Sequence, residues 1–338
     1  MALGLGIKGF LQFGREATWG TAGTVNHRLA YEEFVLDTKP IQEFSQNMPA
    51  GGVSGAPTET PWMEDSANAG MVIVGDYAEA TLTCPLDYRG LLQFIDMMMG
   101  TATFGTYGAS VGTIDVHSMY THTWAKELEK LNSITIESYE TVNLNTVSQG
   151  LGMKVLGLTL SGKAGSGCSM QVNMGGMTKK FNQTKTGSVS AISRVPILMQ
   201  HLAVSDDGFL ASPTIRDFTL SYKPKIAFPR WNSGSANPYE PVREGLIETT
   251  LKYTIEYQAD TIIAAYKAGT QGAPHLTFTS GYRILDILLN KAVIIAAPQP
   301  KPSLNGIMLQ EVTWRAQWLA GTGGMTVTAT CDETGLQA

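Results

Sequence analysis

The sequence predicts a mainly β protein in which one domain, carrying a short flanking helix, occurs twice in tandem. Three observations support this prediction. The 338 residues include 36 glycines among runs rich in Thr, Val, Tyr and Ser, a composition typical of strands joined by many turns. The octapeptide EFVLDTKP at 33–40 returns as DFTLSYKP at 217–224. Further matches follow in the same order along both halves, as an internal duplication requires.

The composition excludes several classes of protein. Hydrophobic residues make up 43 % and charged residues 16 % of the chain, which is typical of a globular protein. The net charge of −5, without any Lys/Arg cluster, argues against a reader of nucleic-acid sequence. The longest apolar runs, such as AVIIAA at 292–297, are far shorter than the roughly 20 residues of a membrane helix. Because the N-terminus also lacks the pattern of a signal peptide, we expect a soluble protein made in the cytoplasm.

The first copy begins with strand 33–40. A Gly/Pro/Ser-rich stretch then fills most of 41–78 and is interpreted as a long loop. Residues 79–100 begin with the alternation of a half-buried strand and change to a short apolar helix, which is expected to end at a left-handed Gly100. The second copy repeats this segment without gaps at 248–269.

Two later matches complete the repeat. KLNSITIES at 130–138 aligns with LLNKAVIIA at 288–296. The stretches 156–174 and 310–330 each show two alternating runs around a glycine-rich turn, the pattern of a β-hairpin. The expected organisation is an N-terminal arm at 1–25, a first domain at 26–180, a linker at 181–194 and a second domain at 195–338.

No motif predicts catalysis, a cofactor or a metal site. GLTLSGKA at 157–164 approaches a phosphate-binding loop, but Ala164 stands where a hydroxyl is needed and no helix follows, so a hairpin is expected. The histidines lack metal-ligand spacing, and His122, in an alternating strand, is interpreted as structural. The clustered methionines are expected in the core. Three dispersed cysteines are interpreted as small hydrophobes: Cys84, Cys168 and Cys331.

The segment FGREATWGTA at 13–22 resembles a motif near the N-terminus of many phage tail tube proteins. The matching positions are Gly14, Arg15, Glu16, Thr18, Trp19, Gly20 and Thr21. The order of strand, long loop, strand, helix, strands and closing hairpin is also similar to the tail-tube fold, over most of both halves. The second copy departs from the pattern, because no such motif precedes DFTLSYKP.

The resemblance implies two tandem β-sandwich or half-barrel domains in a siphovirus-type major tail tube subunit. Six such domains normally form a ring whose inner sheets enclose the DNA channel, so two copies per chain imply a trimer with pseudo-sixfold symmetry. The implied partners are further copies of the chain, the tape measure protein, the tail terminator, tail-tip proteins and double-stranded DNA that passes without sequence-specific binding. The implied location is the virion tail, assembled in the host cytoplasm.

Assembly contacts are expected in the N-terminal arm, in the 41–78 loop and along the repeated strands. In the family, arms and loops of this kind bridge stacked rings. The candidate residues are Arg15, Glu16, Trp19, Pro57, Pro61, Trp62, Phe34, Leu36, Phe218 and Leu220.

Two other readings stay open. A baseplate hub or capsid decoration protein would share the fold but stop at a closed ring. A tandem β-sandwich module that binds a ligand such as carbohydrate would be secreted and would expose an aromatic platform. Nothing in the motifs supports an enzyme.

Overall fold

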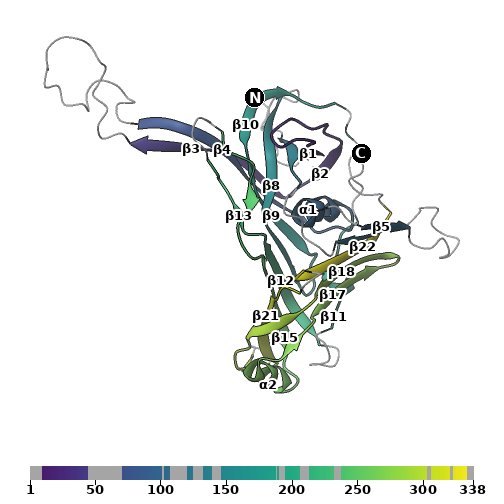
Figure 1. Cartoon of the computed structure of the whole chain (residues 1–338). Coiled ribbons are helices and arrows are strands. Elements are labelled where there is room, and N and C mark those ends of the chain that lie inside the picture. Colours follow the sequence, from purple (N-terminus) through teal and green to yellow (C-terminus); the bar gives the residue numbers. More distant parts are fainter. Residues whose placement is uncertain are drawn as a thin grey trace, which may run out of the picture.

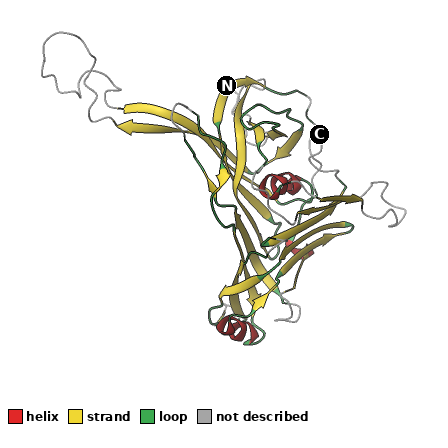
Figure 2. Ribbon diagram, in the orientation of Figure 1, coloured by secondary structure: helices red, strands yellow, loops and turns green. Residues whose placement is uncertain are grey.

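A computed structural model of the chain describes residues 10–44, 71–100, 103–106, 120–124, 132–138, 146–187, 189, 195–205, 213–231, 237–302, 306–319 and 323–332. Antiparallel strands dominate this part of the chain, and its two α-helices are α1 (Gly90–Met99) and α2 (Thr261–Ala268) (Figure 2). The prediction of a mainly β fold is confirmed. Neither helix is long and apolar enough to span a bilayer. We call the residues up to 187 the first unit and those from 195 the second unit.

The strands of the first unit are β1 (Phe10–Arg15), β2 (His27–Ala30), β3 (Glu33–Phe44), β4 (Met71–Pro85), β5 (Thr103–Thr106), β6 (Tyr120–Trp124), β7 (Ile134–Ser138), β8 (Thr146–Lys163), β9 (Ser169–Gly176) and β10 (Thr178–Thr184). The second unit contains β11 (Leu202–Ser205), β12 (Ile215–Lys223), β13 (Ile226–Ala227), β14 (Val242–Arg243), β15 (Glu248–Glu256), β16 (Gln271–Gly272), β17 (His275–Ser280), β18 (Arg283–Leu289), β19 (Ala292–Ala296), β20 (Lys301–Pro302), β21 (Met308–Ala316) and β22 (Met325–Cys331), with a short 3-10 turn at Met199–His201.

One large sheet passes through both units. Its central order is β3-β4-β9-β8-β12-β15-β21-β19, and every neighbouring pair is antiparallel (Figure 1). The first four strands belong to the first unit and the last four to the second. β10 and β7-β1-β2 attach to β8, while β16 and β20 attach at the far end. The two predicted domains therefore share a sheet and are not joined only by a linker.

The junction between the units depends on the length of β8. The first half of this strand pairs with β7, over Ser148 to Met153. The second half, from Leu158 to Lys163, pairs on the same edge with β12, the first strand of the large sheet in the second unit. The opposite edge of β8 is occupied by β10 and then β9. A single 18-residue strand thus holds both units in one hydrogen-bonded surface.

A second sheet, in the order β11-β17-β18-β22-β6-β5, also crosses between the units, since β22 of the second unit pairs with β6 of the first. A continuous apolar core lies between the two sheets and extends beneath α1. Alternation explains which side chains enter it: Phe218, Leu220 and Tyr222 of β12 are buried, while the intervening residues are not. Inside this core the Trp314 indole donates to the Tyr253 hydroxyl at 2.9 Å.

The first two matched segments of the expected repeat occupy corresponding places in the large sheet, with one shift. β3 and β4 pair as β12 and β15 do, and each hairpin strand leads to its helix. However, Phe34 lies opposite Leu82, whereas Leu220 lies opposite Leu251, the residue aligned with Leu82. Phe34 therefore occupies the sheet position of Leu220, two residues beyond Phe218, on which the octapeptide match places it. A slip of two residues keeps the same face of the strand toward the core, which is why the pattern survives it.

The two later matches in the repeat are wrong. Residues 156–174 do form the β8–β9 hairpin, but β21 and β22 do not pair with each other. β21 stays in the large sheet beside β15, and β22 crosses to the second sheet. By position, β21 replaces β9 and β19 replaces β8. A glycine-rich turn between two alternating runs fixes a change of direction, but not which sheet the chain enters next.

Three expected boundaries also change. Residues 41–44 and 71–78, expected in the long loop, continue the hairpin strands as far as the pair Phe44 and Met71; the stretch 45–70 lies outside the described residues. The expected linker begins inside β10, which ends at Thr184. The expected N-terminal arm contains β1, which is paired with β7. The division into two domains is retained as a proposal.

The helix ends follow the sequence only in part. Gly269, after α2, has φ 63° and ψ 30°, which is the expected left-handed cap. Gly100, after α1, has φ 96° and ψ −170°, a conformation outside the left-handed helical region. Both positions require glycine, but only the second helix has the expected cap.

An ion cluster fastens the C-terminal end of β22 to both units. The Asp332 carboxylate accepts from Arg89, which precedes α1 in the first unit, with Nε at 2.8 Å. Arg283, at the start of β18 in the second unit, lies 3.3 Å from the same carboxylate, whose side chain is 3 % exposed. Burial raises the pKa of Asp332, but the hydrogen bonds from Arg89 and Arg283 outweigh burial and lower this pKa to about 2.

This cluster predicts a specific loss of stability in acid. Folding lowers the pKa of Asp332 from about 3.9 in the unfolded chain to about 2. The contribution of Asp332 to the free energy of unfolding is therefore present above pH 4 and disappears as the pH falls from about 4 to about 2. Asp332→Asn should lower the free energy of unfolding at pH 7 and flatten its pH dependence in that window. Urea unfolding of both proteins at several pH values measures this, and equal slopes below pH 4 would contradict it.

Candidate functional site: an open sheet face and its two edges

The face of the large sheet opposite the core carries mostly small polar side chains. Along β12 and β15 the outward residues include Thr219, Ser221, Thr250 and Thr254, between the buried positions of the same strands. β9 and β8 continue the pattern with alternating polar residues: Ser169, Gln171, Asn173, Thr159 and Ser161. The sheet therefore presents a broad hydroxyl and amide surface that crosses the junction between the units.

Cross-strand hydrogen bonds organise this surface. The Ser161 and Ser169 hydroxyls lie 2.9 Å apart across the β8–β9 pair. The Thr254 hydroxyl donates to the Asp217 carboxylate at 2.8 Å. A longer contact, from the Thr81 hydroxyl to the Asn173 side-chain oxygen, measures 3.3 Å. Such pairs hold the short side chains close to the sheet.

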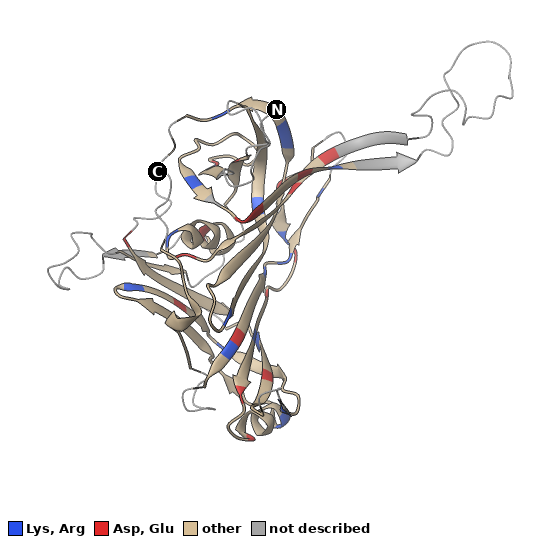
Figure 3. Cartoon of the chain, turned by 180° about the vertical axis from the view of Figure 1, so that it is seen from behind, with Lys and Arg blue, Asp and Glu red and all other residues tan. Residues whose placement is uncertain are grey.

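Charges on the open face occur mostly as pairs of opposite sign. The Lys252 ammonium lies 2.8 Å from Glu311. Arg315 lies 3.9 Å from Glu248, and Lys39 lies 3.7 Å from Asp37. Figure 3 shows Lys and Arg interspersed with Asp and Glu along these strands, with no basic stripe among the described residues. These ion pairs partly neutralise the cations that could otherwise attract a polyanion to the described part of this face.

The sheet ends in two open edges. β3 pairs only with β4 among the described strands. At the other end, β16 covers Ala292 and Val293 of β19 but stops there, so the remainder of that edge has no partner strand in the described part. Each edge strand also exposes one large aliphatic side chain, Val35 on β3 and Ile295 on β19, both 44 % exposed. Unprotected edges with apolar residues favour pairing with another chain.

One end of the open face is covered by a segment of the same chain. The connection from β12 to β15, which contains β13 and β14, lies against the first unit. Phe228 contacts Tyr77 edge-to-face, with ring centroids 5.3 Å apart. Lys154 of β8 is only 1 % exposed, and its ammonium lies 2.8 Å from Glu240 and 3.3 Å from the Pro241 carbonyl oxygen. A buried lysine of this kind depends on its partners, because an uncompensated buried charge is costly.

The GREATWGTA motif forms a buried hydrogen-bond network around Glu16 and Trp19, which we call the Glu16 knot; the name refers to the hydrogen bonds and not to the path of the backbone. Glu16 is 6 % exposed, and its carboxylate accepts from Gly20 N and Ser133 Oγ at one oxygen and from Thr135 Oγ1 and Gly152 N at the other, at 2.8 to 3.0 Å. The Trp19 indole donates to the Gly152 carbonyl oxygen at 2.9 Å. The motif therefore ties β1 to β7 and β8.

Two glycines make the knot possible. Gly152 has φ +67°, and a Cβ there would lie 2.7 Å from the Trp19 indole nitrogen. Gly20 has φ +74°, and its Cβ would lie 2.2 Å from the Met177 sulfur. Arg15 is exposed and donates to the Asn132 side chain at 2.9 Å. Of the three candidate residues in the motif, Arg15 alone is exposed.

The candidate residues on the repeated strands lie largely in the core. Phe218, Leu220 and Leu36 are buried within one chain, and Phe34 is half-buried against the core. Contacts of these strands with another copy would therefore use backbone groups and the outward residues between them. The remaining candidates, Pro57, Pro61 and Trp62, lie outside the described residues. Assembly roles for all of them stay predictions.

Several residues of the site were not singled out by sequence reasoning. Val35 and Ile295 stand inside ordinary alternating strands, and only the strand order places them at opposite edges. Lys154 could have been suspected, because it is the sole charge in an otherwise apolar stretch, GLGMKVLGL. Its partner Glu240 is far away in the sequence and gives no matching signal.

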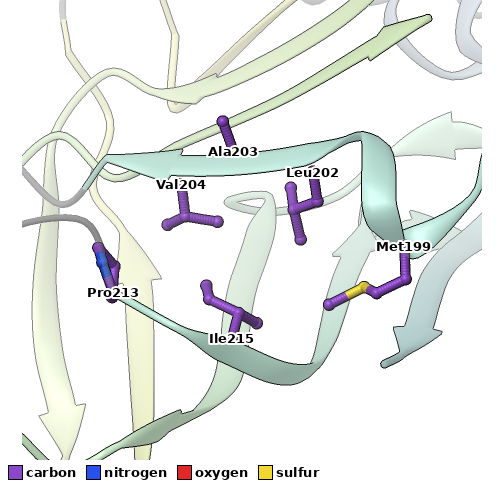
Figure 4. Close-up of a pocket in the computed structure, with 6 residues that line it drawn as sticks. All are labelled: Met199, Leu202, Ala203, Val204, Pro213 and Ile215. Atoms are coloured by element: carbon purple, nitrogen blue, oxygen red, sulfur yellow. The ribbon is translucent and has the colours of Figure 1, made fainter. Parts of the chain in front are cut away.

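One small pocket lies among the described residues. Figure 4 shows a pocket of about 220 Å³ between β11 and the start of β12, lined by Met199, Leu202, Ala203, Val204, Pro213 and Ile215. It is smaller than the roughly 300 Å³ typical of ligand pockets, and none of these side chains can titrate. The part of the chain that the structure describes holds no group of His, Cys, Asp or Glu arranged for a metal ion. Lys163 is exposed beside the β8–β9 turn, as the hairpin interpretation predicts.

The buried residues with reactive side chains are structural. His122 is buried and stacks on Trp124, with ring centroids 5.8 Å apart, as predicted for a structural histidine. All three cysteines are buried and lie outside disulfides, and burial raises the pKa of the Cys168 thiol to about 11.

Comparison with known proteins gives one match. The sequence matches a family model described as phage tail tube protein over residues 6–316, a range that includes the first unit and the second unit as far as the end of β21. A search of the curated proteins returned no match.

The knot around Glu16 predicts a large loss of stability on truncation. Glu16→Ala would leave buried donors unpaired, at about 1–3 kcal/mol each, so the free energy of unfolding should fall by about 3 kcal/mol or more. Arg15→Ala is the matched control and should change it by less than about 0.5 kcal/mol, because Arg15 is exposed. Urea unfolding measures both. A stable Glu16→Ala protein that fails only in assembly would show that the motif acts between chains.

Proposed function

Because the chain belongs to the phage tail tube protein family and is thus a structural component of the virion tail, we propose that three copies close into a ring and that rings stack into a hollow tube for DNA. The β8–β12 junction is the single observation that carries this proposal. It shows, inside one chain, how the sheet of one unit joins the sheet of the next.

Strand directions support ring closure. The eight central strands alternate in direction from β3 to β19, so β3 of a second copy would lie antiparallel to β19 of the first. By sheet position, β3 corresponds to β12 and β19 corresponds to β8. The contact between copies would then repeat the junction within the chain, and six units from three chains would close the sheet into a barrel without edges.

The side chains at the two edges fit this contact. Within the chain, Ser221 lies opposite Thr159. The residue at the sheet position of Ser221 is Val35, and the position of Thr159 falls at the bulge of β19, beside Ile295. The repeated junction would therefore bring the two exposed aliphatic residues together and remove both from water.

The open sheet face suits the wall of a DNA channel. If the core side of the sheet faces outward in the ring, the polar face lines the lumen. Paired charges and short hydroxyl side chains offer no clustered cations to retain phosphates, so DNA would pass without being held. The net charge of −5 per chain acts in the same direction.

The remaining roles follow from membership of the family. We propose assembly in the host cytoplasm, with tape measure, terminator and tail-tip proteins setting the length and ends of the tube. DNA would be a passing cargo. In this proposal the protein partners would contact the surfaces and strand edges of the rings, and DNA would contact the wall of the channel.

Negative-stain electron microscopy combined with light scattering tests this function. We expect hollow rings or tubes as the concentration rises, with a ring mass of three times 36.4 kDa. A tail-tip complex is added where purified chain alone stays monomeric, because tube growth can require an initiator. Uniform monomers with the initiator present would overturn the proposal, and a ring of six chains would overturn its stoichiometry.

The edge contact predicts a charge-swap phenotype. Ile295→Glu should weaken ring formation by about tenfold, because it places a charge in an apolar contact near Asp37 of the neighbouring copy. Val35→Lys should also weaken it, and the double variant should recover part of the loss. The mass distribution from light scattering at several concentrations measures the effect. Unchanged unfolding curves show that these exposed positions do not affect the fold, and additive losses in the double variant would contradict the pairing.

A further inference from the structure

The contact of the β12–β15 connection with the first unit provides a template for a second contact between copies. Beyond Lys223 the hairpin continues as β13 and β14 and turns over the open face of the first unit. Phe228 covers Gly175 so closely that a Cβ there would lie 2.5 Å from its ring. Together with Tyr77 and the buried Lys154, these residues form a covered patch at the end of the sheet.

The first unit has the same hairpin without the same support. β3 and β4 also continue beyond the Lys-Pro pair that both octapeptides share, as far as Phe44 and Met71. The sequence match extends over this continuation, since KPIQEF at 39–44 aligns with KPKIAF at 223–228 and places Phe44 on Phe228. In Figure 1 the β3–β4 hairpin projects away from the body of the chain. From Tyr77 back to Met71, β4 pairs only with β3 among the described strands.

The second unit contains the equivalent surface, and its described residues are exposed or half-buried. The gapless match of β4 with β15 places Leu246 at the position of Tyr77. The sheet registers then place Gln317 at the position of Gly175, and Lys291, whose carbonyl oxygen accepts from Gln317 N at 2.6 Å, at the position of Lys154.

Exposure distinguishes the two patches. Leu246 is 80 % exposed, and the nearby Trp318 is 52 % exposed. Lys291 is half-buried and forms no ion pair within the described part of the chain, whereas Lys154 is buried against Glu240. The Gln317 side chain is turned toward β16, where its oxygen accepts from Gln271 at 3.4 Å. A patch that is closed in the first unit is therefore open in the second.

We propose that the end of the β3–β4 hairpin, around Phe44, covers the patch of Leu246, Lys291, Gln317 and Trp318 on the second unit of a neighbouring copy. This inference rests on the proposed ring, and it adds a contact that lies over the sheet face and not along its edges. In a ring of three, every unit would then have one covered end. Removal of Leu246 and Trp318 from water gives the contact its driving force.

Photocross-linking tests the proposal in assembled rings of the full chain. Phe44→p-benzoylphenylalanine keeps an aromatic ring at the probe position and reaches over several ångströms, enough for the two-residue register shift between the units. After irradiation, peptides that contain Leu246, Lys291 or Gln317 to Leu319 should be joined to the Phe44 peptide of a different copy, giving covalent dimers and trimers. Phe228→p-benzoylphenylalanine is the matched control, and should link within one chain to the peptide of Tyr77 or Gly175.

A surface variant gives an independent readout. Leu246→Asp should raise the concentration needed for ring formation by about tenfold without changing the unfolding curve. Tyr266→Asp, at an exposed position on α2, is the control and should leave ring formation unchanged. Rings that form normally in Leu246→Asp, or whose Phe44 probe links to another surface, would overturn this inference and leave the proposed function intact. Absence of rings from the unmodified chain would instead overturn the proposed function.

Discussion

The structure depends on the need of every edge strand for a partner. A sheet with one polar face and open edges is prone to pair with other chains. Within this chain β8 is long enough for its second half to pair with β12, so that neither of these two strands is left as an edge. Its first half is closed by β7 and its second half by β12, so two units become one continuous sheet. The same demand then falls on β3 and β19. The covered core, the shared second sheet and the ion cluster at Asp332 all stabilise the relative placement of units that this junction establishes.

The duplication and most of the strands could be predicted from the sequence, because alternation and capping are local. Leu251, Tyr253 and Ile255 are buried as their period requires, and Gly269 caps its helix. Pairing between distant strands is not local, and there the sequence reasoning failed. The second glycine-rich turn looked like a hairpin, yet Trp314 remains in the large sheet while Val327 lies in the other. The motif around Glu16 was recognisable, but its chemistry is set by Ser133, Thr135 and Gly152, whose approach no spacing rule reveals.

The two units resemble each other in strand order but differ where they meet other surfaces. The first unit alone has the Glu16 knot, which fixes β1 against β7 and β8. The connection between β12 and β15 also covers Lys154 of the first unit, whereas Lys291 at the matching position forms no ion pair among the described residues. The difference at Lys154 follows from the order of the units, because the connection that covers the first unit belongs to the unit that follows it in the chain.

Duplication also changes the energetics of a ring. In a ring of six separate units, every junction would form by association and would carry the loss of translational and rotational freedom. In the proposed ring of three chains with two units each, half of the junctions would form during folding, and the number of edges that must be protected before assembly would fall by half. The apolar part of each remaining edge is short. β16 pairs with the start of β19, and Glu33 and Asp37 lie two residues to either side of Val35 on β3. A short apolar contact within a polar edge favours antiparallel pairing with a copy of the same chain over indiscriminate aggregation, since only the matching register buries Val35 and Ile295 together.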